Sequence, residues 1–349
     1  MPRLAKLALV LALLIATLAA GLHVLPPGRG EASATKPRSV GSGKPVVLAF
    51  GGDVHFEGVL ASKLAADPAG LLAPIEPVLD DADLAVVNLE TAITTGGSPV
   101  AKQFAFSAPS AAFVALREGG VDVASMANNH GLDYGRAGLR DSLAAAKRHR
   151  FPVIGIGLDG KQAYRPFRRT INGQKIAVLG ATQVIDDELI STWTAGPSKP
   201  GLASAKEVPR LLREVRLARR TSDTVVVFLH WGVELEQCPT RDQRTLARQL
   251  VAAGADIVVG GHAHRLLGAG RMDGALVGYG LGNFVWYGSS DLSTRTGVLF
   301  VTVTGRKVSE YHWVPARIVD GVPRALAGDA RRSELASWRS LRRCTGLKP

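Results

Sequence analysis

Short apolar runs, each followed by polar side chains or a turn, constrain the fold of this 349-residue chain more than any other feature. The runs are rich in Val, Ile and Leu and are shorter than most helices, which favours buried strands. Helix-like segments at residues 136–148, 205–220 and 241–253 lie between several of them, so we expect βαβ units in a layered α/β fold. The strand-like runs are residues 46–50, 84–87, 121–125, 153–156, 176–180, 224–229 and 257–259.

Polar clusters follow five of these runs, and five of the eight histidines fall within them. Because the carboxyl ends of strands in an open α/β sheet line one crevice, we expect the clusters to converge on a single site. Carboxylate, amide and imidazole groups suit Mn, Fe or Zn, and two such ions need about six to eight side chains. The clusters are Gly51-Gly52-Asp53-Val54-His55, Asn88-Leu89-Glu90, Asn128-Asn129-His130, His230-Trp231-Gly232 and Gly260-Gly261-His262-Ala263-His264.

The order of these motifs resembles that of calcineurin-like metallophosphoesterases. The residues within and around the motifs resemble those of the CapA family of poly-γ-glutamate capsule-biosynthesis proteins. The resemblance covers about residues 46–319 and implies a metallophosphoesterase-like sandwich with helices packed on central β-sheets. It rests on Gly52-Asp53, Asn88-Leu89-Glu90-Thr91, Ala127-Asn128-Asn129-His130 with Asp133-Tyr134-Gly135, His230-Trp231-Gly232-Val233-Glu234 and Leu281-Gly282-Asn283-Phe284.

The resemblance implies two divalent metal ions, Mn, Fe or Zn, with Glu90 bridging them. His130 takes the position beside the leaving group, and Asp133 is a candidate orienting partner. Two positions depart from the family pattern, because Glu90 stands where Asp is usual and Asn128 where Gly is usual. The remaining ligands implied are Asp53, His55 and His264 on one ion, and Asn129, His230 and His262 on the other.

Four further residues lie beside the predicted ligands in the sequence. They are candidates for contacting substrate or for orienting imidazoles. Packing in the core or placement on the surface explains them equally well. For Asn283, which follows Gly282, a role in a turn is a further explanation. The four are Trp231, Glu234, Arg265 and Asn283.

The ligand set and the resemblance together predict a metal-dependent hydrolase of phosphoester-like bonds. The resemblance alone implies that it acts in capsule (poly-γ-glutamate) or cell-envelope polymer biosynthesis. Its expected partners are an anionic envelope polymer or phosphoester substrate and the membrane subunits of a capsule synthase. The alternative is a non-catalytic, polymer-binding component of a capsule synthesis or export complex, which Glu90 at the bridging position favours. A secreted nuclease or nucleotidase would share the chemistry and differ in substrate.

The formal net charge of +12 raises the question of nucleic-acid binding, and its distribution answers it. Residues 1–44 carry +5 of this charge and residues 320–349 carry +4, so the long middle of the chain carries only +3. No stripe of basic and aromatic residues interrupts that middle part. We therefore expect solvated basic ends and no nucleic-acid partner.

The start of the chain has the pattern of an export signal. Arg3 and Lys6 precede an apolar run from Leu7 to Leu25, so residues 1–25 are expected to be a signal peptide or a retained signal anchor. In either case the domain lies outside the cytoplasm, secreted or anchored to the membrane. Residues 26–44 are interpreted as a linker, 45–319 as the CapA-type domain and 320–349 as a basic C-terminal tail.

Cys238 and Cys344 are the chain's two cysteines. In an oxidising compartment they can form one disulfide. Two unpaired thiols remain the alternative, because sequence alone does not bring their Cα atoms within reach of each other.

The export interpretation predicts where a fused reporter is active. Alkaline phosphatase joined after residue 44 should be active, because the basic start and apolar run direct translocation. A β-galactosidase fusion at the same position should be inactive. Enzyme assays on cells carrying each fusion measure this, and a reporter that works only in the cytoplasm would remove the proposed link to the capsule.

Overall fold

The computed structural model describes residues 41–349 of the chain. The predicted signal segment at residues 1–25 and most of the linker at 26–44 lie outside the described residues. Within residues 41–349, no helix combines the length and the apolar character needed to cross a bilayer.

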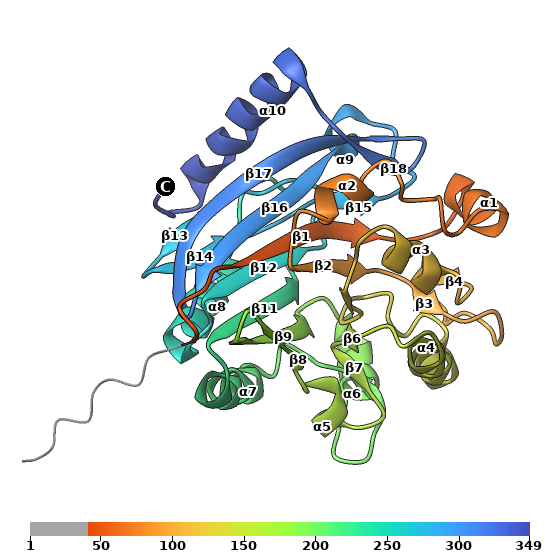
Figure 1. Cartoon of the computed structure of the whole chain (residues 1–349). Coiled ribbons are helices and arrows are strands. Elements are labelled where there is room, and N and C mark those ends of the chain that lie inside the picture. Colours follow the sequence, from red (N-terminus) through yellow and green to blue (C-terminus); the bar gives the residue numbers. More distant parts are fainter. Residues whose placement is uncertain (1–40) are drawn as a thin grey trace, which may run out of the picture. The chain divides into compact units, whose positions relative to one another are not determined.

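The first sheet has the strand order β18-β17-β16-β1-β2-β5-β6, and β15 also pairs with β1 (Figure 1). Strands β1, β2, β5 and β6 are parallel, whereas β16, β17 and β18 extend the sheet in antiparallel pairs. Their bounds are β1 Val46–Val54, β2 Leu84–Leu89, β5 Val123–Ser125, β6 Val153–Ile154, β15 Asn283–Val285, β16 Arg295–Thr304, β17 Lys307–Val319 and β18 Val322–Ala325.

The second sheet has the order β13-β14-β12-β11-β9-β8. Its four central strands are parallel, and β13 and β8 pair antiparallel at the two edges. The bounds are β8 Phe167–Ile171, β9 Gln174–Thr182, β11 Thr224–His230, β12 Ile257–Gly261, β13 Ala269–Met272 and β14 Ala275–Gly278. Two small pairs complete the strands: β3 Ala92–Ile93 with β4 Ser107–Ala108, and β7 Ile156–Gly157 with β10 Gly201–Leu202.

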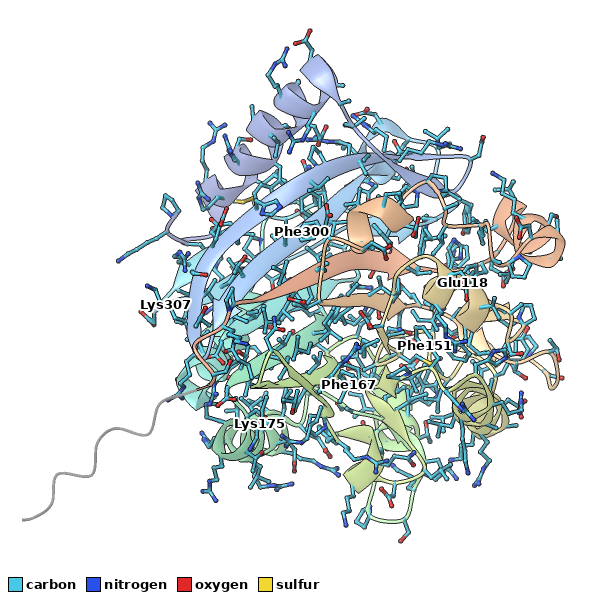
Figure 2. All side chains as sticks on the ribbon, in the orientation of Figure 1. Glu118, Phe151, Phe167, Lys175, Phe300 and Lys307 are labelled. Carbon is cyan, nitrogen blue, oxygen red and sulfur yellow. A yellow bond between two sulfur atoms is a disulfide. The ribbon has the colours of Figure 1, made fainter. Side chains whose placement is uncertain are left out.

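The two sheets pack face to face through a shared apolar core. Alternate residues of β1, such as Leu48 and Phe50, meet Val226 and Phe228 of β11 in this core. Figure 2 shows side chains filling the space between and around the sheets. Helices cover the outer faces: α1 Val59–Ala66, α2 Glu76–Leu79, α3 Ala112–Glu118 and α4 Gly135–His149 on the first sheet, and α7 Val208–Thr221 and α8 Arg241–Ala253 on the second. The short helices α5 Gly160–Ala163, α6 Ile190–Trp193 and α9 Asp291–Thr294 lie in connections between strands.

This layered α/β sandwich confirms the predicted fold class. Each predicted strand is present, although the run at 153–156 is divided between β6 and β7. The helix predicted at 241–253 has local causes at both ends. Thr240 and Gln243 form a reciprocal capping box at its start, and Gly254 ends it with a φ of 110° that favours glycine.

The C-terminal segment corrects the prediction of a basic tail at residues 320–349. After β18, helix α10 (Gly328–Ser340) packs along β17, and the 3₁₀ turn Leu341–Cys344 reaches β13 (Figure 1). Trp338 is buried and stacks on Trp313, with ring centroids 5.3 Å apart. Residues 320–349 therefore belong to the fold and close the edge of the sandwich between β17 and β13. The charge pattern did not indicate this packing, because α10 carries the exposed arginines Arg331, Arg332 and Arg339 and only one buried apolar side chain, Trp338.

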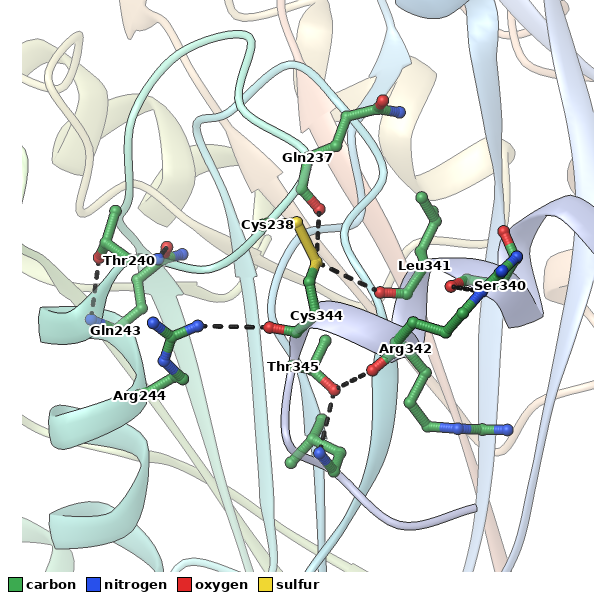
Figure 3. Close-up of a disulfide and its surroundings, with 12 residues drawn as sticks. Gln237, Cys238, Thr240, Gln243, Arg244, Ser340, Leu341, Arg342, Cys344 and Thr345 are labelled. Atoms are coloured by element: carbon green, nitrogen blue, oxygen red, sulfur yellow. Dashed lines mark hydrogen bonds between the residues drawn. A yellow bond between two sulfur atoms is a disulfide. The ribbon is translucent and has the colours of Figure 1, made fainter.

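A disulfide joins Cys238 to Cys344, with Cα atoms 5.7 Å apart (Figure 3). It links the loop before α8 to the residues after α10. Arg244 supports the same junction by donating to the carbonyl oxygen of Cys344 at 3.3 Å. The sequence left open whether the two cysteines form a disulfide or remain unpaired thiols. In the structure they form the disulfide.

Removing this disulfide should destabilise the fold without changing the candidate site. The bridge joins residues 106 positions apart, and for a loop of that length the chain-entropy model gives about 5 kcal/mol. Urea unfolding of the wild type with and without reductant, and of Cys344→Ser, measures the change in free energy of unfolding. Two thiols that react with an alkylating reagent in the unfolded, unreduced protein would contradict the bridge.

Candidate metal centre

The five polar clusters converge where the carboxyl ends of the parallel strands in the two sheets lie side by side. Asp53 lies near the end of β1, Glu90 directly follows β2, and residues 128–130 follow β5. From the second sheet, His230 ends β11, and His262 and His264 follow β12. The convergence that was predicted from strand ends is therefore present, although it involves two sheets rather than one.

Asp53 joins the two sheets. Its Oδ2 accepts a hydrogen bond from the backbone N–H of His262 at 2.9 Å, and its Oδ1 accepts one from the side chain of Asn88 at 2.9 Å. Gly261 makes this close approach possible, because a Cβ there would lie 2.0 Å from Asp53 Oδ1. At Gly52 a Cβ would lie 1.9 Å from the carbonyl oxygen of Gly282. The glycines of these motifs are thus needed for backbone approach.

Glu90 is the shared member of two groups of side chains that could hold a metal ion. One group is Glu90, His230 and His262, and the other is Asp53, Glu90 and His264. Within each group the ligand atoms lie within 4.8 Å of one another. Glu90 is fully buried and belongs to both groups, and its role as a bridging ligand stays a prediction.

The donor set fits divalent cations. Both ring nitrogens of His55, Glu90 Oε1 and His262 Nδ1 are buried and have no hydrogen-bond partner among the described residues. Unpaired buried polar atoms are unfavourable and rare in folded proteins, and coordination would satisfy them. Carboxylate and imidazole ligands together suit Mn, Fe or Zn.

His55 lies at the margin of this arrangement. It belongs to neither of the two groups. Its ring packs 3.9 Å from that of Trp286 and 4.9 Å from that of Phe106, between centroids. Because His264 also packs on Trp286 at 4.4 Å, an aromatic wall holds both imidazoles beside the centre.

An amide network positions His230, a member of the group with Glu90 and His262. Asn129 Oδ1 lies 2.7 Å from His230 Nε2, and Asn88 Nδ2 lies 3.1 Å from His230 Nδ1. The side chain of Asn128 donates to Asn88 Oδ1 at 3.0 Å and accepts from the backbone N–H of His130 at 3.0 Å. Asn128, one of the two departures from the family pattern, thus ties the loop after β5 to β2. The motif Asn88-Leu89-Glu90 did not by itself indicate that Asn88 contacts both Asp53 and His230.

Burial and mutual charge shift the pKa values at the centre. Burial and the neighbouring Asp53 raise the pKa of Glu90 to about 8. Burial lowers the pKa of His55 and that of His230 to about 3, and lowers that of His262 well below its usual value. For His264, burial acts to lower the pKa, but the carboxylates of Glu90 and Asp53 outweigh it and raise the value. The centre therefore combines three neutral imidazoles, those of His55, His230 and His262, with two groups whose raised pKa values favour the protonated form, Glu90 and His264.

His130 is held by a buried network. Its Nδ1 lies 2.5 Å from Asp133 Oδ2, while its Nε2 faces Glu90 Oε1 at 4.0 Å. Phe106 stacks on its ring at 4.1 Å between centroids. Lys102 binds the other oxygen of Asp133 at 2.9 Å and also donates to the carbonyl oxygen of Asn129. Sequence reasoning missed Lys102, which lies in the loop between β3 and β4 and belongs to no recognised motif.

The four flanking candidates have different roles. Asn283 orients the ring of His264, because its Oδ1 lies 2.8 Å from His264 Nδ1 while its Nδ2 donates to the carbonyl oxygen of Ser293 at 2.9 Å. Trp231 is buried in the core under the second sheet, and its indole N–H donates to the carbonyl oxygen of Tyr279 at 2.8 Å, so its role is packing. Glu234 is exposed, and Arg265 donates to the carbonyl oxygen of His264 at 3.1 Å.

Comparison with solved structures concerns the fold alone. A hypothetical protein from Thermus thermophilus superposes with a TM-score of 0.51 at 20% identity, covering 78% of this chain and 99% of that chain.

Comparison with curated proteins and families concerns the sequence. The chain is 30% identical over 229 residues to the capsule biosynthesis protein CapA of Bacillus anthracis, covering 64% of this chain and 54% of that protein. It is 31% identical over 215 residues to the PGA biosynthesis protein CapA of Bacillus subtilis (strain 168), covering 61% and 55%. The chain thus spans about half the length of these relatives. The family model described as "Bacterial capsule synthesis protein PGA_cap" matches residues 47–287, which is more than half of the chain and contains every predicted metal ligand. The resemblance to CapA proteins is confirmed, and the chain belongs to the family of bacterial capsule synthesis proteins.

Proposed function

We propose that this protein is a metal-dependent hydrolase of phosphoester-like bonds that acts outside the cytoplasm in the biosynthesis of a capsule or envelope polymer. The observation that carries the proposal is the pair of ligand groups that share the buried Glu90. A structural role alone would not require two adjoining groups beside a histidine that is held by a carboxylate.

The residues that would hold two ions are the two groups around Glu90, with Asn129 and His55 beside them. When bound, divalent ions supply positive charge that activates water and stabilises the charge developing on phosphoryl oxygens. Asp53 anchors this region to both sheets, and Asn283 fixes the ring of His264. The chain's own contribution is therefore a rigid set of donors whose orientation is fixed before substrate arrives.

His130 is the proposed general acid. Asp133 holds its Nδ1, so its Nε2 is directed toward the centre and can donate a proton to the leaving oxygen. Phe106 restricts the ring from one face. Lys102 fixes Asp133 from the other side, which keeps the pair in place without contacting the reacting atoms.

The polymer connection rests on family membership. Relatives carry names that refer to capsule and PGA biosynthesis, and from these we infer an anionic envelope polymer or a phosphoester intermediate as substrate. Membrane subunits of a capsule synthase are the proposed partners. The basic and apolar residues at the start of the chain support secretion or membrane anchoring.

Two substitutions should separate metal binding from turnover. Glu90→Gln should lower metal content and activity together, because this carboxylate serves both groups. His130→Ala should retain metal and lower kcat by roughly 10²- to 10³-fold, because it removes a proton donor. A third variant, His264→Ala, should lose metal only from the group that contains Asp53, Glu90 and His264. Elemental analysis measures the metal content, and hydrolysis of a panel of phosphoesters measures the activity.

Glu118→Gln is the matched control, since Glu118 is exposed and lies at the end of α3, outside every cluster (Figure 2). A folded wild type that retains no Mn, Fe or Zn after reconstitution would contradict the hydrolase proposal. Metal retention with no hydrolysis of any ester would instead favour a polymer-binding component of a capsule synthesis complex.

Metal affinity should rise with pH. With its pKa raised to about 8, Glu90 is mostly protonated at pH 7 in the metal-free protein, and His264 also has a raised pKa. A cation needs both groups deprotonated, so protons compete with it below about pH 8. His230, whose pKa is lowered to about 3, is already neutral and releases no proton. Titration calorimetry with Mn²⁺ in buffers of different ionisation enthalpy counts the protons released, and a constant affinity from about pH 6 to about pH 9 would contradict the assignment.

A further inference from the structure

A basic groove of about 420 Å³ lies between α10 and β17, away from the metal centre. Arg331, Arg339 and Arg342 line it, and no acidic residue does. Its volume lies within the usual range for ligand sites. No hydrogen bond or ion pair within residues 41–349 holds the side chains of Arg331 and Arg339, so two guanidinium groups are free to bind an anion.

The groove is separate from the metal centre. Tyr311, which lines it, pairs with Val301 of β16, and Val301 pairs with Leu48 near the start of β1. Asp53 lies five residues further along β1, which corresponds to about 16 Å of strand. A ligand in the groove would therefore contact neither group of metal ligands.

The groove combines cationic and apolar surface. Leu335 and the ring of Tyr311 are half-buried within it, and the stacked Trp313 and Trp338 lie beneath. Arg342 donates to the hydroxyl of Tyr311 at 3.0 Å, so one guanidinium is fixed at the end of the groove. A ligand that matches this surface needs both anionic groups and short hydrocarbon segments.

The arginines are also spaced for an extended ligand. Arg331 and Arg339 are eight residues apart on α10, which places them about 12 Å apart along the helix axis. An extended ligand that carries several anionic groups can therefore contact both at once. Guanidinium groups bind carboxylates through paired N–H donors, and methylene groups between the carboxylates would lie on the apolar floor.

We propose that the groove between α10 and β17 binds an acidic polypeptide chain, a polymer of glutamate, through its carboxylates. The proposal rests on the polymer connection of the proposed function, but it does not depend on hydrolysis at the metal centre. Polyphosphate and nucleic-acid backbones match the cations, but they lack the carboxylate-bearing methylene segments that suit Leu335 and Tyr311.

The disulfide fixes one end of the site. Cys344 lies two residues after Arg342, and the bridge ties it to the loop before α8 (Figure 3). In Figure 3 the side chain of Arg342 extends away from the disulfide. Reduction should therefore weaken polymer binding by releasing the end of the segment that carries the arginines.

The test uses the full chain and a fluorescein-labelled oligomer of γ-linked glutamate, with binding followed by fluorescence anisotropy at fixed salt. The double variant R331Q/R339Q should weaken binding by about tenfold or more, because it removes two charge-assisted contacts. The matched control is R332Q/R343Q, which removes the same charge from residues of the same segment outside the groove. It should change affinity by less than about twofold.

Four outcomes would overturn the proposal. The wild type could fail to bind the oligomer at all. Equal losses in the two double variants would mean that only overall charge matters. Competition by linear polyphosphate as strong as that by unlabelled glutamate oligomer, at equal charge, would remove the assignment to polycarboxylate. Binding that disappears with EDTA or in Glu90→Gln would place the polymer in the metal centre instead. Binding that persists under both conditions supports the groove even if the phosphoester panel shows no hydrolysis.

Discussion

The carboxylate of Asp53 is the interaction on which the centre depends. It accepts from the backbone of His262 in the second sheet and from Asn88 in the first, so it holds the carboxyl ends of the two sheets together. The glycines at 52 and 261 allow the backbones to approach closely enough for this contact. This junction brings His230 at the end of β11, and His262 and His264 after β12, to the side of the centre where Glu90 lies.

Burial explains why this junction suits cations. Glu90 and Asp53 lie close together in the interior, which raises the pKa of Glu90, while the imidazoles of His55, His230 and His262 are kept neutral. The neutral imidazoles can coordinate a cation directly, whereas Glu90 must first release its proton, which the positive charge of a cation favours. The amides of Asn88, Asn128 and Asn129 orient these donors without adding charge, and Asp133 with Lys102 does the same for His130.

The C-terminal segment both closes the edge of the sandwich and lines the groove that we propose as a polymer site. Trp338 fills the end of the core between the sheets, which stabilises the fold, while Arg331 and Arg339 of the same helix line the groove beside it. The disulfide holds the segment at its far end. A polymer site on this edge and a metal centre at the strand ends would let one chain hold a long anionic polymer independently of the chemistry at the centre.

The sequence by itself determined the strands, the layered fold and the residues that gather at the centre. Each of these depends on local patterns: apolar runs form strands, and the residues after parallel strands share one edge. Only the tertiary structure decided which side chains contact each other across distant parts of the chain. Lys102 reaches His130 from a loop without a motif, and Trp231 points into the core although it follows a predicted ligand. The pairing of Cys238 with Cys344 and the packing of α10 likewise depend on contacts across long stretches of chain, which local patterns do not encode.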